Sequence, residues 1–187
     1  MKKLMVILFI AVLALTMLAC GRQVEEVPQD QDPNNNGNGT VVDPNPADEE
    51  KEVTLYFMNQ EYIETGNEEV EKVIEVKREV TVGEQSLEEA VMAELQKKPE
   101  EGMYTSLENI KILSVETVEN TAYVNISSDG LYGGSLEEIS LMNQVVLTLT
   151  DLPDIKAVQF LVDGSKRETL MGHFLIEEPI TREDIGF

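Results

Sequence analysis

The sequence has few of the residues on which many functions depend. Cysteine and histidine occur once each, as Cys20 and His173, in a chain of 187 residues. A single cysteine excludes a disulfide within the chain, and a single histidine leaves a metal site or a Ser-His-Asp triad with one candidate imidazole. Lysine and arginine number 14 against 36 acidic residues, which gives a net charge of −22. So acidic a chain is repelled by nucleic acid and by anionic lipid head groups, and neither is an expected partner.

The first twenty residues have the pattern of a secretory signal. Lys2 and Lys3 precede the uncharged run 4–18, which is shorter than the roughly 20 apolar residues of a membrane-spanning helix. The run ends in Met-Leu-Ala before Cys20, and this ending resembles the lipobox of bacterial lipoproteins. In that family the cysteine thiol receives diacylglycerol and the peptide is cut before the cysteine. We predict a signal peptide over 1–19 and lipidation at Cys20; the alternatives are an ordinary signal peptide with a chance cysteine and an uncleaved anchor.

Residues 20–51 have the composition of a disordered tether that begins at the lipidated cysteine. Residues 21–50 contain four prolines, an asparagine- and glycine-rich run at 34–39, many acids and no aromatic residue. Such a segment cannot bury enough apolar surface to offset the entropy lost on ordering. As a flexible coil it reaches about 30 Å, and charge repulsion lengthens it.

Residues 52–187 form one domain-sized block in which five strands are expected. Apolar residues recur at every second position in most of them, as in a strand with one buried face. The strands cover residues 53–58, 74–82, 110–117, 121–127 and 158–162. In the fourth strand, Thr121, Tyr123 and Asn125 lie on the polar face, which is open to solvent or to a partner.

Two helices are expected, each beginning with a capping box. Ser86 and Glu89 form the first box, and Ser135 and Glu138 form the second. The second helix carries an apolar stripe of Leu136, Ile139, Met142, Val146 and Leu149. The element order is therefore β-β-α-β-β-α-β. The simplest arrangement is an α+β fold in which two amphipathic helices pack on one face of a single, largely antiparallel sheet.

Six segments of the block carry a family resemblance. They are residues 53–57, 78–80, 143–153, 158–164, 172–174 and 179–182. Together they resemble the GerMN domain of sporulation and spore-germination proteins, over nearly all of 52–187. That domain is similar to the ring-building motifs of envelope secretion machines, which are protein-interaction modules, and it has no known catalytic residues. The resemblance implies an extracytoplasmic assembly role in a Gram-positive bacterium, with envelope proteins or further copies of the chain as partners.

The residues give little support to an enzyme. His173 is more typical of a turn than of a catalytic base, and Ser135 is better explained as a helix cap than as a nucleophile. The sequence has no HExxH, GxSxG or phosphate-loop motif. We predict no catalytic, cofactor or metal site. The alternatives are a lipoprotein that binds a small ligand or a wall glycan such as peptidoglycan, and a wall-active hydrolase with a carboxylate pair.

Four further residues are candidates for specific contacts. Arg78 shares the parity of the apolar residues in its strand, so we expect it to point inward and pair with a carboxylate. Arg182 is expected to tie the C-terminal segment to the domain. Tyr56 and Tyr123 are predicted on the polar faces of their strands. Because exposed aromatic residues can anchor interfaces, these two tyrosines are the candidates for partner contact.

The variant Cys20→Ser tests the predicted anchor. Without the thiol no diacylglycerol can be attached, so we expect the chain in the medium or unprocessed. The anchor is strong because each buried CH₂ of an acyl chain contributes about 0.8 kcal/mol. Cell fractionation with mass spectrometry of the mature amino terminus measures the outcome. Membrane retention of the variant at the mature size would contradict the prediction.

Overall fold

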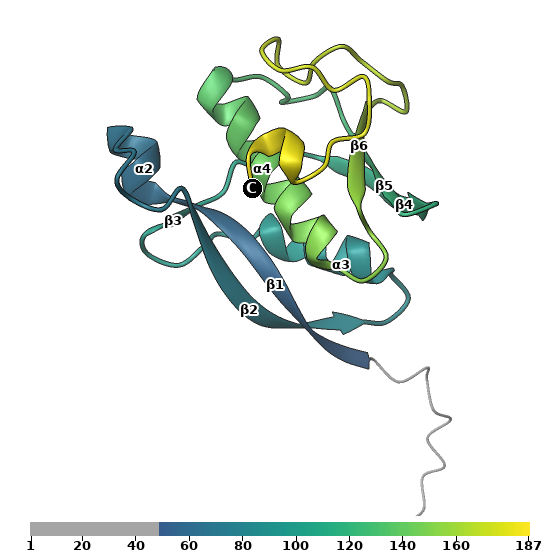
Figure 1. The fold of residues 1–187 in the computed structure, drawn as a ribbon. Helices are drawn as coiled ribbons and strands as arrows, with labels where there is room; N and C mark the ends of the chain where they lie inside the picture. The colour runs from purple at the N-terminus through teal and green to yellow at the C-terminus, as the bar shows by residue number, and fades with distance from the viewer. Residues whose placement is uncertain (1–48) are drawn as a thin grey trace, which may run out of the picture. The chain divides into compact units, whose positions relative to one another are not determined.

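The computed structural model describes residues 49–187, which Figure 1 draws as a coloured ribbon. The predicted signal peptide, Cys20 and the predicted tether up to residue 48 lie outside the described residues. In chain order the elements are β1 Glu49–Asn59, α2 Gln60–Thr65, β2 Val73–Val82, α3 Leu87–Leu95, β3 Met103–Tyr104, β4 Ile112–Val118, β5 Thr121–Ile126, α4 Ser135–Asp151, β6 Ala157–Val162 and the 3₁₀ helix η1 Glu183–Ile185. The predicted α+β class and order of the long elements are confirmed, whereas α2 and β3 have no counterpart in the predicted order.

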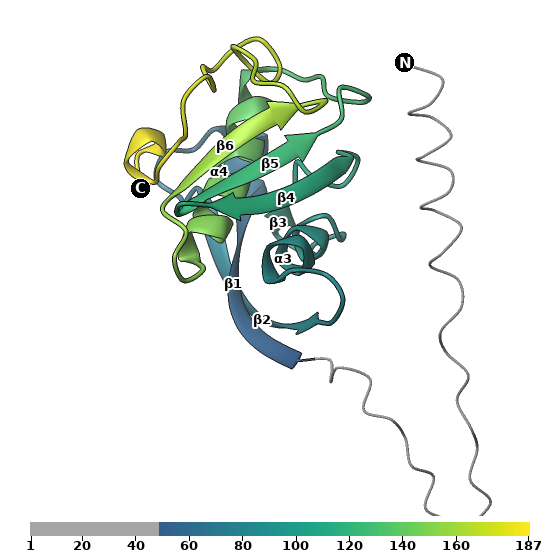
Figure 2. The same ribbon diagram turned by 90° about the vertical axis from the view of Figure 1, so that its right-hand side faces the viewer.

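The strands form two sheets, where the sequence pattern predicts one. Their orders are β2-β1-β3 and β4-β5-β6, with three strands in each (Figures 1 and 2). β5 and β6 run parallel because α4 carries the chain back between them, and every other pair is antiparallel. β1 begins at Glu49, so the first sheet includes residues before 52, the predicted start of the domain.

The outer edge of β1 explains why the sheets stay separate. β3 pairs with this edge only at Met58 and Asn59. At Tyr56 the backbone N–H instead donates to Thr148 Oγ1 on α4, at 3.1 Å. A helix side chain thus occupies the place where another strand would pair, and the sheet ends there.

Helix α4 is buried on most of its sides rather than amphipathic. It packs against β1 of the first sheet and β6 of the second, and Figure 2 shows it behind the β4-β5-β6 sheet. Met142, Val146 and Leu149 of the predicted stripe are buried, but Leu136 is 41% exposed, so the stripe is wrong at its N-terminal end. A helix buried all round is a core element. Within residues 49–187, none of the helices has the length and apolarity that a membrane span needs.

Glu138 on α4 holds the loop after β6 from inside the protein. Its carboxylate is fully buried. Oε1 accepts the N–H groups of Leu170 and Met171, each at 2.9 Å, and Oε2 accepts the N–H of His173 at 2.8 Å. A buried carboxylate is tolerated when charge-assisted hydrogen bonds replace its hydration. The loop is therefore fixed to the helix through one side chain.

The two predicted capping boxes have different outcomes. Ser86 accepts the N–H of Glu89, and Glu89 accepts the N–H of Ser86, so the first box is confirmed. The second box is wrong, because the N-cap of α4 is Gly134 and no side chain bonds there. Ser135 is an exposed first-turn residue, and Glu138 turns inward instead. Three buried hydrogen bonds outweigh the single exposed one that a cap would give.

The second sheet has one buried and one open face, as predicted for its central strand. Ala122, Val124 and Ile126 are fully buried, and Figure 2 shows α4 behind the sheet on one side. Tyr123 and Asn125 are half-buried on the opposite face. The tight turn between β4 and β5 has positive φ angles at both of its residues, as a type I′ hairpin requires.

Glu138→Ala and Ser135→Ala test which of the two residues stabilises α4. Loss of the Glu138 carboxylate leaves three backbone donors without their acceptor, so we expect the free energy of unfolding to fall by about 2–4 kcal/mol. Ser135→Ala, the matched control on the same helix, should change it by less than about 0.5 kcal/mol, because Ser135 makes no cap bond. Urea denaturation measures both. A larger loss for Ser135→Ala would restore the capping-box interpretation.

Candidate functional site

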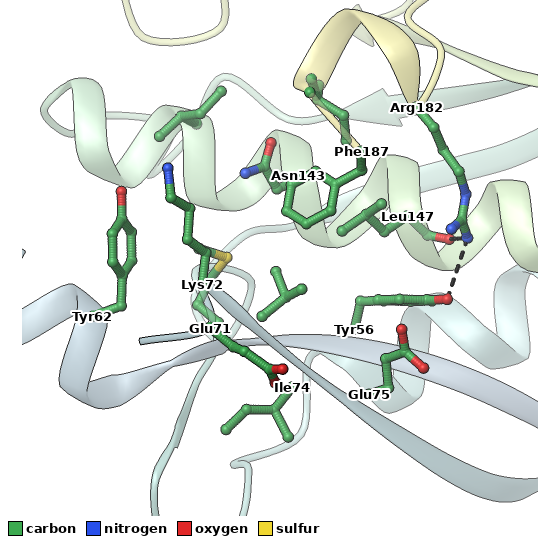
Figure 3. Close-up of a pocket in the computed structure, with 15 residues that line it drawn as sticks. Tyr56, Tyr62, Glu71, Lys72, Ile74, Glu75, Asn143, Leu147, Arg182 and Phe187 are labelled. Carbon is green, nitrogen blue, oxygen red and sulfur yellow. Dashed lines mark hydrogen bonds between the residues drawn. The ribbon is translucent and has the colours of Figure 1, made fainter. Parts of the chain in front are cut away.

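A groove of about 930 Å³ lies on the face of the first sheet that turns away from α3 (Figure 3). Val53, Leu55 and Phe57 on β1 point into the core with α3, so the alternate residues of β1 point to the groove. α4 forms one wall, the segment after β6 contributes its last residues, and α2 with the start of β2 completes the rim. The groove thus joins segments far apart in the chain.

The floor of the groove combines apolar residues with one unsatisfied amide. Tyr56, Met58 and Leu147 are each at most 5% exposed. Asn143 on α4 is 6% exposed, and its Oδ1 has no hydrogen-bond partner among the described residues. Figure 3 shows this amide reaching from the helix between Lys72 and Phe187. The groove therefore offers a buried hydrogen-bonding group to whatever enters it.

The rim carries aromatic rings and charges of both signs. The Lys72 ammonium lies 5.4 Å from the centre of the Tyr62 ring and 3.0 Å from the Glu68 carboxylate. Glu71 and Glu75 line the groove without an ion-pair partner in the described part of the chain. The charge of Lys72 is therefore neutralised by Glu68, whereas the charges of the Glu71 and Glu75 carboxylates are not neutralised by any described residue.

Arg182 fixes the C-terminal segment beside the groove, as the sequence predicts. Its Nε donates to Thr150 Oγ1 at 2.8 Å, and its Nη2 donates to the Leu147 carbonyl oxygen at 2.6 Å. Nη2 also lies 3.2 Å from Asp151 Oδ1, and the guanidinium lies 5.1 Å from the centre of the Tyr56 ring. Burial raises the pKa of the Tyr56 hydroxyl, and the hydrogen bond from Arg182 offsets part of that rise.

The structure does not bring the two candidate tyrosines together. Tyr56 lies in the floor of the groove at 5% exposure, so its predicted solvent-facing position is wrong. The alternation of residues along β1 shows which side chains share a face, but it cannot show that α4 and Arg182 cover the polar face. Tyr123 lies on the open face of the second sheet, in a shallow depression of about 410 Å³ lined also by Glu116 and Val118. Contact of either tyrosine with a partner stays a prediction.

Sequence reasoning missed three residues of the groove. Asn143 interrupts the apolar run of α4, and a polar residue at such a position is a usable signal for a buried amide. Tyr62 lies on α2 and Lys72 directly before β2, and nothing in their spacing along the chain predicts that they meet.

The structure gives His173, the one candidate imidazole, a place on the exposed loop after β6. His173 is exposed; its ring Nε2 lies 3.4 Å from the Gly133 carbonyl oxygen, and its backbone is held by Glu138. Among residues 49–187, no group of three or more His, Cys, Asp or Glu is placed to hold a metal ion.

Arg78 pairs with carboxylates, as the sequence predicts. Its guanidinium lies 3.6 Å from the carboxylate of Glu94 and 3.2 Å from that of Glu100.

Comparison with known proteins identifies the family. Residues 54–168 match the model of the Germane family, described as sporulation and spore germination. The chain belongs to this family. Its fold is similar to that of the tandem GerMN domains of the sporulation protein GerM from Bacillus subtilis, with 23% identity and a TM-score of 0.56 over 71% of this chain. The first GerMN domain of that protein gives 17% identity and a TM-score of 0.56 over 72% of this chain.

These similarities confirm the GerMN resemblance at the level of the fold. This chain spans 46% of the tandem structure and 99% of the single-domain structure. It therefore corresponds in extent to one GerMN domain. No curated protein matches the chain.

The variant Arg182→Lys tests the contact that fixes the C-terminal segment. Lysine keeps the charge but cannot reproduce the forked hydrogen bonds, so we expect the free energy of unfolding to fall by about 1–2 kcal/mol. Amide exchange at Gly186 and Phe187, whose N–H groups bond Glu183 and Arg182, should accelerate.

Arg167→Lys is the control for this variant. Arg167 pairs with Asp163 at 3.6 Å on the surface, where the expected change is within about 0.5 kcal/mol. Urea denaturation measures the free energy of unfolding of both variants. If both lose the same amount, the contacts of Arg182 stabilise the protein no more than an exposed ion pair does, and the prediction is wrong.

Proposed function

We propose that this domain is a non-catalytic binding module that holds a segment of a partner protein in its groove. In the same proposal, lipid on Cys20 keeps the module on the outer face of the cytoplasmic membrane of a Gram-positive cell. Its role there is the assembly of a sporulation, germination or envelope complex. Family membership, the lipobox-like ending at Cys20 and the acidic net charge support this placement.

The unsatisfied amide of Asn143 is the observation that carries the proposal. A buried acceptor without a partner costs about 1–3 kcal/mol of stability. The other buried amide of α4 does not carry this cost, since Gln144 accepts the N–H of Ser106 at 2.9 Å and donates to the Tyr104 carbonyl at 3.4 Å. A ligand that donates a hydrogen bond to Asn143 Oδ1 would give this acceptor a partner. Binding would then recover the free energy that the unpaired acceptor costs the folded protein.

The composition of the groove favours a protein segment as the ligand. An asparagine side chain presents an acceptor and two donors, which match the N–H and C=O groups of a peptide. Around it lie the accessible apolar side chains of Ile139, Ile185 and Phe187 and the ring of Tyr62 at the rim. Aromatic and apolar anchors around a few polar groups are typical of binding sites for proteins and small molecules.

Site-specific photocrosslinking in intact cells tests the proposal. A photoreactive phenylalanine analogue at Tyr62, on the rim, should give a protein adduct. The control position is Tyr132, which is 82% exposed and does not line the groove. Adducts at both positions, or at neither, would count against the groove as the binding site. An adduct at Tyr62 that glycan-degrading enzymes remove would indicate a wall glycan instead.

The variants Asn143→Leu and Gln144→Leu separate binding from stability. Asn143→Leu removes an unpaired polar group, so we expect the free energy of unfolding to rise by about 1 kcal/mol while the Tyr62 adduct is lost. Gln144→Leu removes a paired amide and should lower the free energy of unfolding by about 2 kcal/mol. Thermal unfolding and crosslinking yield measure the two effects. Destabilisation by Asn143→Leu would show that the amide has a structural role.

A further inference from the structure

β2 is an edge strand whose outward backbone groups have no backbone partner within residues 49–187. Tyr56 lies opposite Glu75, and the Tyr56 N–H points away from β2, toward Thr148. In an antiparallel pair, two residues that face each other direct their backbone groups the same way, either both inward or both outward. Glu75 therefore directs its N–H and C=O away from β1. The register has no break, so Lys77 and Glu79, two and four positions on, do the same.

No other segment of the described chain pairs with this edge. Its outward groups at Val73, Glu75, Lys77 and Glu79 make no hydrogen bond with other parts of the described backbone. The edges at β4 and β6 are less regular or are already paired. β4 has an irregular register near Ile112, and β6 is bridged at Val158 by Ile180. Edges that must not pair often contain a proline, a bulge or a lysine; β2 has no proline or bulge, and its Lys77 is paired with Glu52 of the neighbouring strand.

This edge borders the groove. Val73 and Glu75 line the groove and also belong to the free edge. A strand added beside them would direct alternate side chains to the groove face of the sheet. Strand addition to an exposed edge is a common mode of peptide recognition, in which backbone bonds give affinity and side-chain pockets give specificity.

The charges on the groove face favour a basic strand. Glu75 and Glu79 are exposed on this face, and Glu71 adds a third carboxylate at the rim. The intervening Lys77 is already paired with Glu52 at 3.0 Å. A lysine or arginine side chain opposite Glu75 would meet its carboxylate, which has no ion-pair partner among the described residues. The opposite face presents half-buried Ile74 and Val76, which favour apolar neighbours.

We propose that β2 is extended by a strand from a partner protein, in which lysine or arginine alternates with apolar residues and a basic side chain enters the groove. This inference rests on the proposed function, since it names how the groove takes its partner. It predicts that the amide protons of Glu75, Lys77 and Glu79 exchange freely in the unbound protein and become protected on binding.

Amide exchange by NMR with two synthetic peptides tests the inference. The full chain, purified in detergent, is mixed with a short peptide of alternating lysine and valine, or with its glutamate–valine counterpart. We expect the lysine peptide to slow exchange at Glu75 and Lys77 at least about tenfold, and the glutamate peptide to leave it unchanged. Equal slowing by both peptides, or none by either, overturns the proposed partner chemistry.

The variants Lys77→Pro and Lys77→Thr test the backbone contact. Both remove the charge, but only proline removes the outward N–H, at a position where that group does not bond β1. We expect Lys77→Pro to abolish the protection at Glu75 and Glu79, and Lys77→Thr to retain it within about twofold. Urea denaturation confirms that both variants fold; if Lys77→Pro does not, the peptide comparison on the unaltered chain still decides.

The two proposals fail in different ways. If the lysine peptide perturbs groove residues such as Tyr62 while Glu75 and Lys77 remain unprotected, strand addition is wrong and the groove remains the binding site. If no adduct forms at Tyr62 in cells, the proposed function is wrong, and the inference falls with it. Equal protection in Lys77→Pro and Lys77→Thr also overturns strand addition.

Discussion

The fold depends on the polar side chains of the buried helix α4. Glu138 holds the loop after β6, Gln144 bonds the segment at 104–106, and Thr148 caps the edge of β1. Each of these bonds joins parts of the chain that are far apart in sequence. Burial makes the bonds costly to break, because a lost partner leaves a polar group without water. The helix therefore serves both as the apolar core and as the connector between the two sheets.

The groove is a consequence of this arrangement. Because Thr148 bonds the outer edge of β1, α4 lies along that strand and covers Tyr56 and Met58, while the adjoining start of β2 at Val73 and Glu75 stays accessible. The segment held by Arg182 closes part of that face and leaves the remainder open. Asn143 is the one amide of α4 whose acceptor no other segment reaches. The same helix thus stabilises the domain and presents the group through which we propose it binds.

Much of the fold could be predicted from local patterns, and most of the site could not. The five long strands, both long helices and the Ser86 cap follow from periodicity and capping sequences, which act over a few residues. The alternation along β1 predicts an exposed Tyr56, which is wrong, since alternation identifies two faces without showing what covers each. The local sequence predicts that Glu138 caps α4, which is wrong because the three N–H groups that it accepts lie more than thirty residues away.

The α+β class, the order of the long elements, the GerMN resemblance and the lipobox-like pattern at Cys20 follow from the amino-acid sequence without any coordinates. Each of these depends on residues close together in the chain or on a family pattern. The division into two sheets, the burial of α4 and the meeting of Asn143, Tyr62 and Glu75 in one groove are visible only in the folded protein. The physical reason is that burial and hydrogen-bond partnership are set by contacts between distant segments, and no periodicity along the chain encodes those contacts.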